Sequence, residues 1–334
     1  MKKIHIKYIR HKYYLLHKRN LKKRNFGLMS KSMDRALIIA YRLAGNGDNS
    51  NNSVKSALKK FCEFIKTYGV KDLRNITRDH VLLYAEQLIY YYEIGRYKPS
   101  TIQNYLSRVN VALQYASRSE KLHVDPCREA GMPRKSGIAA YDHSTSIYNH
   151  NMAKLLVDER LGVILDLQRF LGLRFKEACL INAIKTYYHA INTNLICIEL
   201  GTKGGKSRKF LISNEIQLSV LYRASIIQGE HYSLIPEEFM WVQFQRLCYR
   251  NISDIDILFN GERHCYANDR YQQLMGVKSP VRSKIKHGER HHEYIAKKLG
   301  ISLSDARERD MNARLIISNE LGHERINITN SYLG

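Results

Sequence analysis

Apolar residues recur every three or four positions over three stretches between residues 54 and 116, a spacing that predicts amphipathic helices. The first stretch follows the polar segment GNGDNSNNS, which predicts a loop. Thr77 is suited to cap the second helix, and Ser100 with Gln103 fits a capping box for the third. The apolar positions are Val54, Leu58, Phe61, Cys62, Ile65 and Tyr68, then Val81, Tyr84, Ala85 and Leu88, then Ile102, Leu106, Val109, Leu113 and Ala116. They predict a small helical domain over residues 49–125.

The helical period stops at residues 126–148, which contain two prolines and two glycines, and this segment predicts an interdomain linker. Helical patterns then resume over most of residues 149–334. One interruption, Leu195–Leu200 and Phe210–Ile212 around a Gly-Thr-Lys-Gly-Gly-Lys turn, predicts an antiparallel hairpin. The expected fold class is mostly α (α+β), with an N-terminal helical domain and a mainly helical second domain that contains this small hairpin or sheet.

Positive charge dominates residues 1–48, where the first acidic residue is Asp34 and lysines and arginines alternate with tyrosines and histidines. The whole chain has 54 lysines and arginines against 31 acidic residues, a net charge of +23. An excess this large favours a polyanionic partner, either nucleic acid or an acidic membrane surface. The basic N-terminal arm is equally consistent with a solvated tail and with a segment that follows a phosphate backbone.

Other compositional features restrict the class of protein. An apolar fraction of 44% is typical of a globular chain. No run approaches the roughly 18 apolar residues that a membrane span needs, and the N-terminal segment lacks the apolar core of a secretory signal. The six cysteines are scattered without a C-x-x-C pair, which argues against a disulfide framework or a zinc ribbon. Together these features favour a cytoplasmic location.

Five separated stretches carry residues with catalytic potential. Taken singly, each has an ordinary structural explanation, such as a surface arginine, a solvated lysine or a hydrogen bond along a helix face. The stretches are Gly172-Leu173-Arg174, the hairpin turn with Lys203 and Lys206, His287-Gly288-Glu289-Arg290, Leu321-Gly322-His323, and Tyr332, nine residues after His323.

In this order and spacing the five stretches resemble the tyrosine recombinase (phage integrase) family. The resemblance extends over about residues 149–332 and makes residues 149–334 the expected catalytic domain. Residues 49–125 are similar, more weakly, to the core-binding domain of that family. The resemblance implies cleavage and rejoining of DNA strands through a 3′-phosphotyrosine, and it implies six catalytic residues: Arg174, Lys203, His287, Arg290, His323 and Tyr332. The pattern departs from the family at Glu289, where an apolar residue is usual.

Elementary chemistry is consistent with these roles. Breaking a phosphodiester bond without a metal requires a nucleophile, groups that stabilise charge on the phosphate oxygens, and an acid for the leaving oxygen. A tyrosine phenol forms a phosphoester that conserves the bond energy, and arginine forks match phosphate oxygens bidentately. Glu177, one helical turn after Arg174, is expected to orient the site through a supporting contact. No metal or other cofactor is expected.

The resemblance also implies the partners. The expected ones are double-stranded DNA with attachment sites, a homo-tetramer on synapsed DNA, and an accessory DNA-bending or directionality factor, for a cytoplasmic, nucleoid-associated integrase of a prophage or other mobile element. No membrane partner is expected. The residues expected to contact DNA are Asn104, Ser107 and Arg108 on the polar face of the third helix, and Lys206 and Arg208 on the hairpin.

Three alternatives remain open at this stage. A type IB topoisomerase shares the arginine, lysine, histidine and tyrosine chemistry, although the H-x-x-R and L-G-H context favours a recombinase. A DNA-binding regulator with an inactive site is disfavoured because all six catalytic residue types are present. A metal site at His287, His291 and His292, with His264 and Cys265, lacks a positioned carboxylate or cysteine pair.

Overall fold

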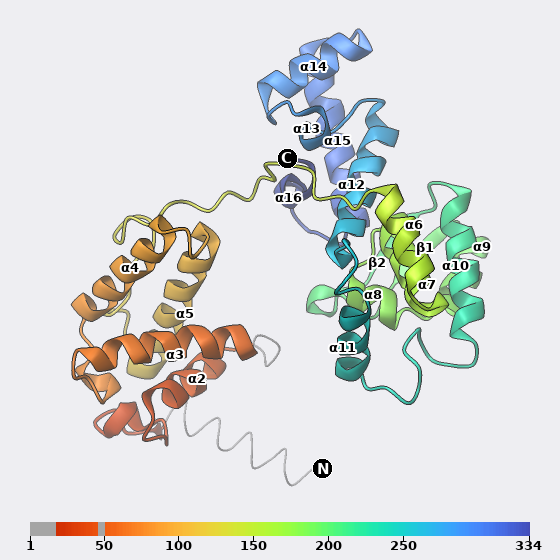
Figure 1. Cartoon of the computed structure of the whole chain (residues 1–334). Coiled ribbons are helices and arrows are strands. Elements are labelled where there is room, and N and C mark those ends of the chain that lie inside the picture. Colours follow the sequence, from red (N-terminus) through yellow and green to blue (C-terminus); the bar gives the residue numbers. More distant parts are fainter. Residues whose placement is uncertain (1–17, 46–50) are drawn as a thin grey trace. The chain divides into compact units, whose positions relative to one another are not determined.

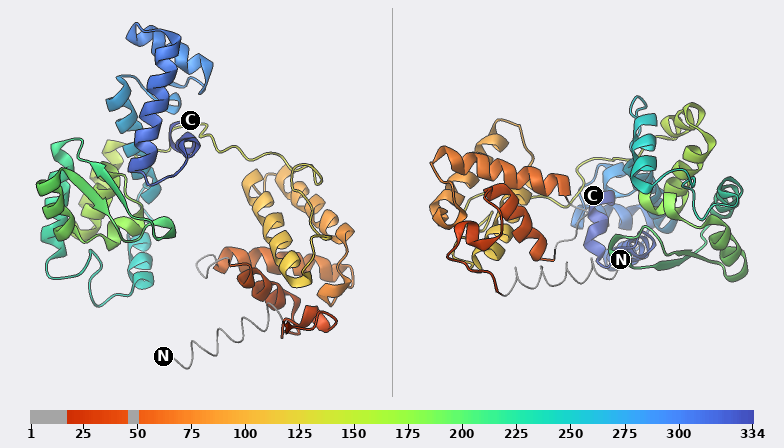
Figure 2. Two further views of the ribbon diagram at one scale, coloured as in Figure 1. Left: turned by 180° about the vertical axis from the view of Figure 1, so that it is seen from behind. Right: turned by 90° about the horizontal axis from the view of Figure 1, so that it is seen from below.

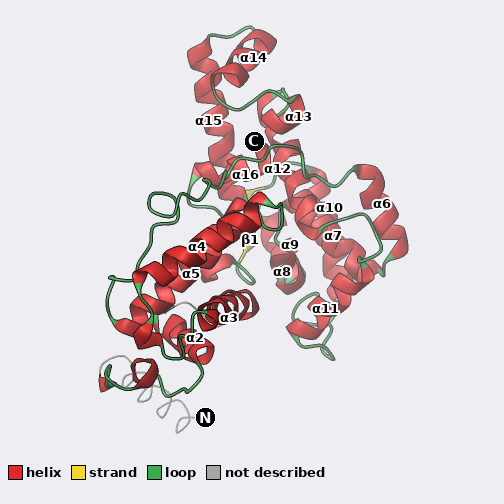
Figure 3. Ribbon diagram, turned by 60° about the vertical axis from the view of Figure 1, so that its left-hand side comes forward, coloured by secondary structure: helices red, strands yellow, loops and turns green. Residues whose placement is uncertain are grey.

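The protein is described by a computed structural model over residues 18–45 and 51–334, with the backbone alone at Asn51 (Figure 1). It divides between Lys135 and Ser136 into two compact units. Figure 3 shows that helices predominate in both units and that the strands are few and short. The expected fold class, mostly helical with one small antiparallel sheet, is confirmed.

The first unit is a group of helices around one apolar core. Its helices are α2 (Met33–Leu43), α3 (Asn51–Thr67), α4 (Arg78–Glu93) and α5 (Pro99–Ser117), with short 3-10 turns at Arg24–Gly27 and Leu73–Asn75. The apolar stripes predicted for α3, α4 and α5 are buried in this core, except for Tyr68, which is exposed. Thr77 accepts a hydrogen bond from the backbone N–H of His80, which confirms the predicted cap.

The third helix begins differently from the prediction. Pro99 occupies its first turn, where a missing N–H costs nothing, and Lys98 precedes it without a side-chain cap. The predicted capping box at Ser100 and Gln103 is therefore wrong. Gln103 is buried and donates instead to the carbonyl oxygen of Pro133 at 2.6 Å.

The basic arm expected over residues 1–48 is only partly separate from the first unit. Helix α2 contributes Met33, Leu37 and other residues to the apolar core. Arg19 is buried and donates to the carbonyl oxygen of Ala116 at 2.7 Å, near the end of α5. Residues 1–17 and 46–50 of the chain, which include the first 17 residues of the expected arm, lie outside the described residues.

The segment expected to link the domains, residues 126–148, divides its contacts between the units. Met132 is buried in the first core. Beyond the boundary, the backbone N–H of Ala139 donates to Asn330 O at 2.8 Å, and that of Thr145 donates to Gly261 O at 3.2 Å. The second half of this segment is thus part of the second unit.

The second unit contains a two-stranded hairpin and many helices. The strands β1 (Leu195–Ile198) and β2 (Arg208–Leu211) pair antiparallel, with Ile196 opposite Phe210, and a 3-10 turn at Lys203–Gly205 lies between them. The helices are α6 (Ile147–Leu156), α7 (Glu159–Leu171), α8 (Phe175–Leu180), α9 (Ala183–Thr193), α10 (Glu215–Gln228), α11 (Trp241–Asn251), α12 (Phe259–Met275), α13 (Pro280–Ser283), α14 (Glu289–Leu299), α15 (Leu303–Glu320) and α16 (Asn330–Leu333).

Two apolar cores organise this second unit. One surrounds α7, in which every residue from 161 to 169 is buried, and it includes the inward residues of the hairpin. The other joins α12, α14, α15 and α16, the blue helices that stand together in Figures 1 and 2. Among the described residues, no helix is long and apolar enough to cross a membrane.

Candidate active site

Tyr332 lies on the single turn of α16 and is 8% exposed. Its hydroxyl accepts a hydrogen bond from Nε of Arg263 at 3.1 Å and lies 3.5 Å from Nε2 of His323. Arg263 Nη2 also contacts His323 Nε2, at 3.2 Å. A phenol, an imidazole and a guanidinium from three separate segments therefore meet at one point.

Arg263 comes from the first half of α12 and is almost completely buried. Its guanidinium donates to the carbonyl oxygens of Gly172 and Leu321. Gly172 precedes Arg174, and Leu321 precedes His323, so one side chain ties both of these turns to the tyrosine. Gly172 must be a glycine, because its φ is +64° and a Cβ there would lie 2.5 Å from the ring of Tyr266.

Glu177 is the anionic centre of the site. Its carboxylate accepts from Arg174 Nη1 at 2.7 Å and from Arg208 at 2.9 and 2.8 Å, and it lies 3.9 Å from Arg263. Burial alone would raise the pKa of Glu177, but the hydrogen bonds and charge of Arg208 and the backbone N–H of Arg174 outweigh it and bring the pKa to about 2. Glu177 thus contacts Arg174 and Arg208 directly, and its carboxylate is ionised at neutral pH.

Arg208 was expected to contact DNA, and in the structure most of its side chain is engaged by other protein groups. Its side chain is 8% exposed, it forms the bidentate pair with Glu177, and its Nε donates to Glu320 O at 2.8 Å. The alternation of β2 turns this side chain inward, toward the other arginines. Arg208 thereby joins the hairpin to α15.

A cleft of about 640 Å³ opens beside the cluster. It is lined by Arg174, the hairpin residues Thr202, Lys203, Lys206 and Arg208, and the turn that contains His323. Lys203 is exposed, and Lys206 forms an ion pair with Glu324. Among the Lys, Arg, Asp and Glu residues that line the cleft, all but Glu324 are cations, which suits a polyanionic ligand.

The surrounding cations make His323 a weak base in the free protein. Burial lowers its pKa, and the positive charges of Arg263, Arg174, Lys203 and Arg208 lower it further, to about 4. Burial likewise lowers the pKa of Arg263, to about 10, so this arginine stays charged at neutral pH. His323 is therefore neutral, and its contacts with Arg263 and Tyr332 require Nε2 to carry the lone pair.

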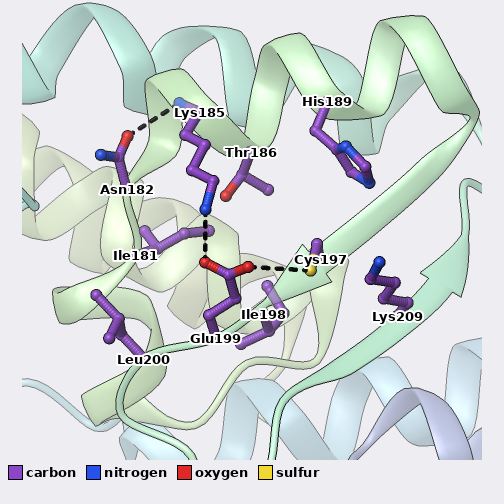
Figure 4. A pocket seen from close by; sticks show the side chains of 10 residues that line it. All are labelled: Ile181, Asn182, Lys185, Thr186, His189, Cys197, Ile198, Glu199, Leu200 and Lys209. Carbon is purple, nitrogen blue, oxygen red and sulfur yellow. Dashed lines mark hydrogen bonds and ion pairs between the residues drawn. The ribbon is translucent and has the colours of Figure 1, made fainter.

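A second pocket, of about 220 Å³, lies between α9 and the hairpin (Figure 4). Inside it, Lys185 Nζ pairs with Glu199 Oε2 at 2.8 Å, and Cys197 Sγ donates to Glu199 Oε1 at 3.8 Å. Both members of the ion pair are at least half exposed, so it contributes little to stability. The ion pair links α9 to the end of β1, just before the turn that contains Lys203.

His287 and Arg290, expected in the site from the H-x-x-R pattern, are not brought to Tyr332. His287 lies before α14 and its Nδ1 contacts Arg314 Nη2 at 3.0 Å, while Arg290 is exposed. Arg263 occupies the position beside the tyrosine that Arg290 was expected to take. The signal for Arg263 was in the sequence: Asn260-Gly261-Glu262-Arg263-His264 differs from His287-Gly288-Glu289-Arg290-His291 only at its first residue.

The remaining expected DNA contacts lie on α5. Asn104 and Ser107 are exposed, as a DNA contact requires, whereas Arg108 is half-buried and donates to Ser53 O at 3.0 Å. Among the described residues, no group of three or more histidine, cysteine or acidic side chains is arranged to hold a metal ion. His264 instead packs against Tyr332, with 4.7 Å between ring centroids and the rings tilted by 45°.

The chain is similar to several known proteins. Residues 138–257 match the sequence model of the Integrase family. The XerH site-specific recombinase bound to its difH substrate is 16% identical, covering 97% of this chain and 89% of that one, with a TM-score of 0.52. The Tn1549 transposon integrase in complex with circular intermediate DNA is 11% identical over 91% and 96% of the two chains, with a TM-score of 0.48.

The lambda integrase tetramer bound to a Holliday junction is 12% identical over 83% and 77%, with a TM-score of 0.46. No curated protein sequence matches the chain. At 16% identity the likeness to XerH shows the fold alone, and the segment that matches the Integrase model contains Arg174, Glu177 and the hairpin. The chain thus contains a segment similar to the Integrase family within a fold similar to that of the XerH recombinase.

Proposed function

We propose that this protein is a site-specific DNA recombinase that cuts and rejoins DNA through a covalent tyrosyl intermediate at Tyr332. The observation that carries the proposal is the Tyr332 hydroxyl, held by Arg263 and His323 next to a cationic cleft. A buried phenol in a core usually meets a single acceptor, as Tyr266 does with Glu320. Tyr332 instead faces a guanidinium and a neutral imidazole, the groups that stabilise a phenolate and accept its proton.

In the proposed reaction, the Tyr332 oxygen attacks the scissile phosphorus and its proton passes to the neutral His323. A phosphorus–oxygen bond to the tyrosine forms, and the bond to the 5′-oxygen breaks. Arg174 and Arg263 stabilise the negative charge that develops on the non-bridging oxygens. Attack by a 5′-hydroxyl on the phosphotyrosine reverses the step and rejoins the strand.

The leaving 5′-oxygen needs a proton, and we assign its delivery to Lys203. This lysine is exposed at the hairpin turn and lines the cleft with Arg174 and His323. Lys206, three residues later, forms an ion pair with Glu324 and is less free to donate.

The partners follow from the same chemistry. Two duplexes contain four strands and each chain offers one Tyr332, so complete exchange requires four copies. We therefore propose a homo-tetramer on two DNA sites, with the first unit contacting DNA through the α5 face that contains Asn104 and Ser107. A net charge of +23 supports the DNA partner. Integration or excision of a mobile element is the process that this activity best fits.

A library of nicked duplexes with a randomised core tests the proposed function and selects the target sequence in the same experiment. With a nick near the scissile bond, cleavage frees a short fragment that bears the 5′-hydroxyl. This fragment diffuses away and cannot rejoin the strand, so the covalent adduct accumulates. We expect an SDS-resistant adduct that maps to Tyr332 and forms equally well in EDTA, because arginines take the place of a metal. DNA binding without an adduct would contradict the proposal, and relaxation of supercoiled plasmid without exchange between two selected sites would indicate a topoisomerase.

Replacing each lysine in turn tests whether Lys203 or Lys206 is the general acid. We expect Lys203→Ala to slow adduct formation on the selected duplex by about 10²- to 10⁴-fold, the usual contribution of a general acid. A 5′-bridging sulfur leaves without a proton, so it should restore the rate of this variant. Lys206→Ala is the matched control from the same turn: loss of a cleft lysine should weaken DNA binding, but at saturating duplex it should cleave both substrates at the normal rate. Sulfur rescue of Lys206→Ala alone would transfer the role to Lys206.

A further inference from the structure

One buried arginine forms hydrogen bonds to both ends of the turn that contains Tyr332. Arg314, on α15, donates through Nη1 to Asn330 Oδ1 at 2.8 Å and through Nη2 to Gly334 O at 3.3 Å. Asn330 lies two residues before Tyr332, and Gly334 lies two residues after it. Because α16 spans four residues, these two bonds hold the ends of the turn that presents the tyrosine.

Arg314 is itself fixed in place. It is 3% exposed, its Nε donates to Asp310 Oδ2 at 2.9 Å, and its Nη2 contacts His287 Nδ1 at 3.0 Å. Asp310 is held in turn by the hydroxyl of Tyr271. Each nitrogen of the planar guanidinium therefore has a partner, and its orientation is set by a buried carboxylate.

Apolar packing alone leaves the angle of the turn undetermined. Leu333 is buried in the core of α12 and α15, and Gly334 lies against Val281. These apolar contacts are non-directional. The backbone N–H of Ala139 bonds Asn330 O at 2.8 Å and the amide of Asn268 bonds Tyr332 O at 3.2 Å, each at a single point, whereas Arg314 bonds both ends of the turn. Neither Arg314 nor Asn330 lines the cleft or contacts Tyr332 through its side chain, so neither is placed to touch the phosphate.

We propose that Arg314 is a positioning residue for the nucleophile: it sets the orientation of the α16 turn through Asn330 and Gly334, and thereby the direction from which the Tyr332 oxygen reaches phosphorus. This inference rests on the proposed function, since it assumes that Tyr332 is the nucleophile. It also gives a role to His287, whose imidazole contacts the guanidinium of Arg314 and helps to fix its orientation.

Asn330 offers the sharpest test, because its replacement leaves the buried pair of Arg314 and Asp310 intact. The measurement is the single-turnover rate of adduct formation at saturating selected duplex. We expect Asn330→Ala to reduce this rate by about 10- to 100-fold, the usual effect of a small misplacement of reacting groups. Asn330→Asp retains an acceptor oxygen for Arg314 and should restore the rate. DNA affinity and melting temperature should change little in both variants.

The 5′-bridging sulfur substrate should leave Asn330→Ala slow, because the defect lies in the attacking oxygen and not in the leaving group. Ser331→Ala is the matched control: Ser331 is exposed on the same turn, bonds Ile328 O and does not contact Arg314. Its rate should stay within about twofold of the wild type. Arg314→Lys should be slow as well, and combining it with Asn330→Ala should add little, because both remove the same bond.

Three results would overturn the inference: a wild-type rate for Asn330→Ala, an equally slow Asn330→Asp, or a loss confined to DNA affinity. Failure of the proposed function itself gives a different result, since the wild-type adduct would then be absent or would map to another residue. In that case the inference falls together with the proposed nucleophile. An adduct at Tyr332 combined with any of the three results above removes only the role of Arg314.

Discussion

Replacement of Tyr332 by phenylalanine is expected to abolish the covalent protein–DNA adduct and all strand exchange. The ring and its packing in the core of α12 and α15 remain, but the oxygen that would bond to phosphorus is gone. Loss of the hydroxyl also leaves Nε of buried Arg263 without its partner, which should cost about 1–3 kcal/mol in the free energy of unfolding. DNA affinity, measured by fluorescence anisotropy, should be close to that of the wild type.

Tyr266→Phe is the matched control for this substitution. Tyr266 is buried in the same core and donates to Glu320 Oε2 at 2.9 Å, so its replacement also removes one buried hydrogen bond. It should retain the adduct after a similar loss of stability. An adduct that persists in Tyr332→Phe would show that another residue attacks the phosphate.

Arg263→Lys is expected to reduce adduct formation by about 100- to 1,000-fold at saturating DNA, whereas Arg290→Lys should leave the rate nearly unchanged. Lysine keeps the charge but cannot reproduce the fork that reaches Tyr332, Gly172 and Leu321 together. Arg290 is exposed on α14, away from the cluster, and its replacement removes only a surface charge. The measurement is the single-turnover rate on the selected duplex.

This pair of variants shows which of two similar segments, Asn260–His264 or His287–His291, supplies the arginine that acts in the site. A slow Arg290→Lys with a normal Arg263→Lys would support the assignment made from the H-x-x-R pattern and would contradict the site proposed from the structure. Because Arg263 is buried, its variant must also be shown to melt as a folded protein, and a reduced rate in a folded, DNA-bound variant supports the proposal.

Much of the fold could be predicted from local patterns. The stripes at three- and four-residue spacing in α3, α4 and α5 are buried as expected, because amphipathic helices must bury their apolar face. The hairpin was predicted from its apolar strands and glycine-rich turn. The start of α5 was missed because the fixed φ of Pro99 set the first turn and left Gln103 free to bond Pro133.

The site was predicted in part. Arg174, Lys203 and His323 line one cleft, and Tyr332 lies beside it, as the family spacing implied. The roles of these residues remain predictions. Arg208 shows what spacing cannot reveal, since a hairpin arginine expected to face DNA turns inward to Glu177. The direction of a side chain on a short strand depends on the register and on the partner available to it, and both are tertiary properties.

By itself, the sequence determined three properties: the mostly helical fold class, the basic character of the chain, and the nine-residue spacing between His323 and Tyr332. These properties can be read directly from composition and from residues close together in the chain. Only the tertiary structure decided which of two nearly identical segments reaches the tyrosine. Asn260–His264 begins α12, where residues 261–268 are all buried and Arg263 finds the carbonyls of Gly172 and Leu321. His287–His291 runs into the first turn of α14, where Arg290 is exposed. The physical reason is burial: a guanidinium enters a core only where distant backbone carbonyls and a carboxylate compensate its lost hydration, and those partners come from other parts of the chain.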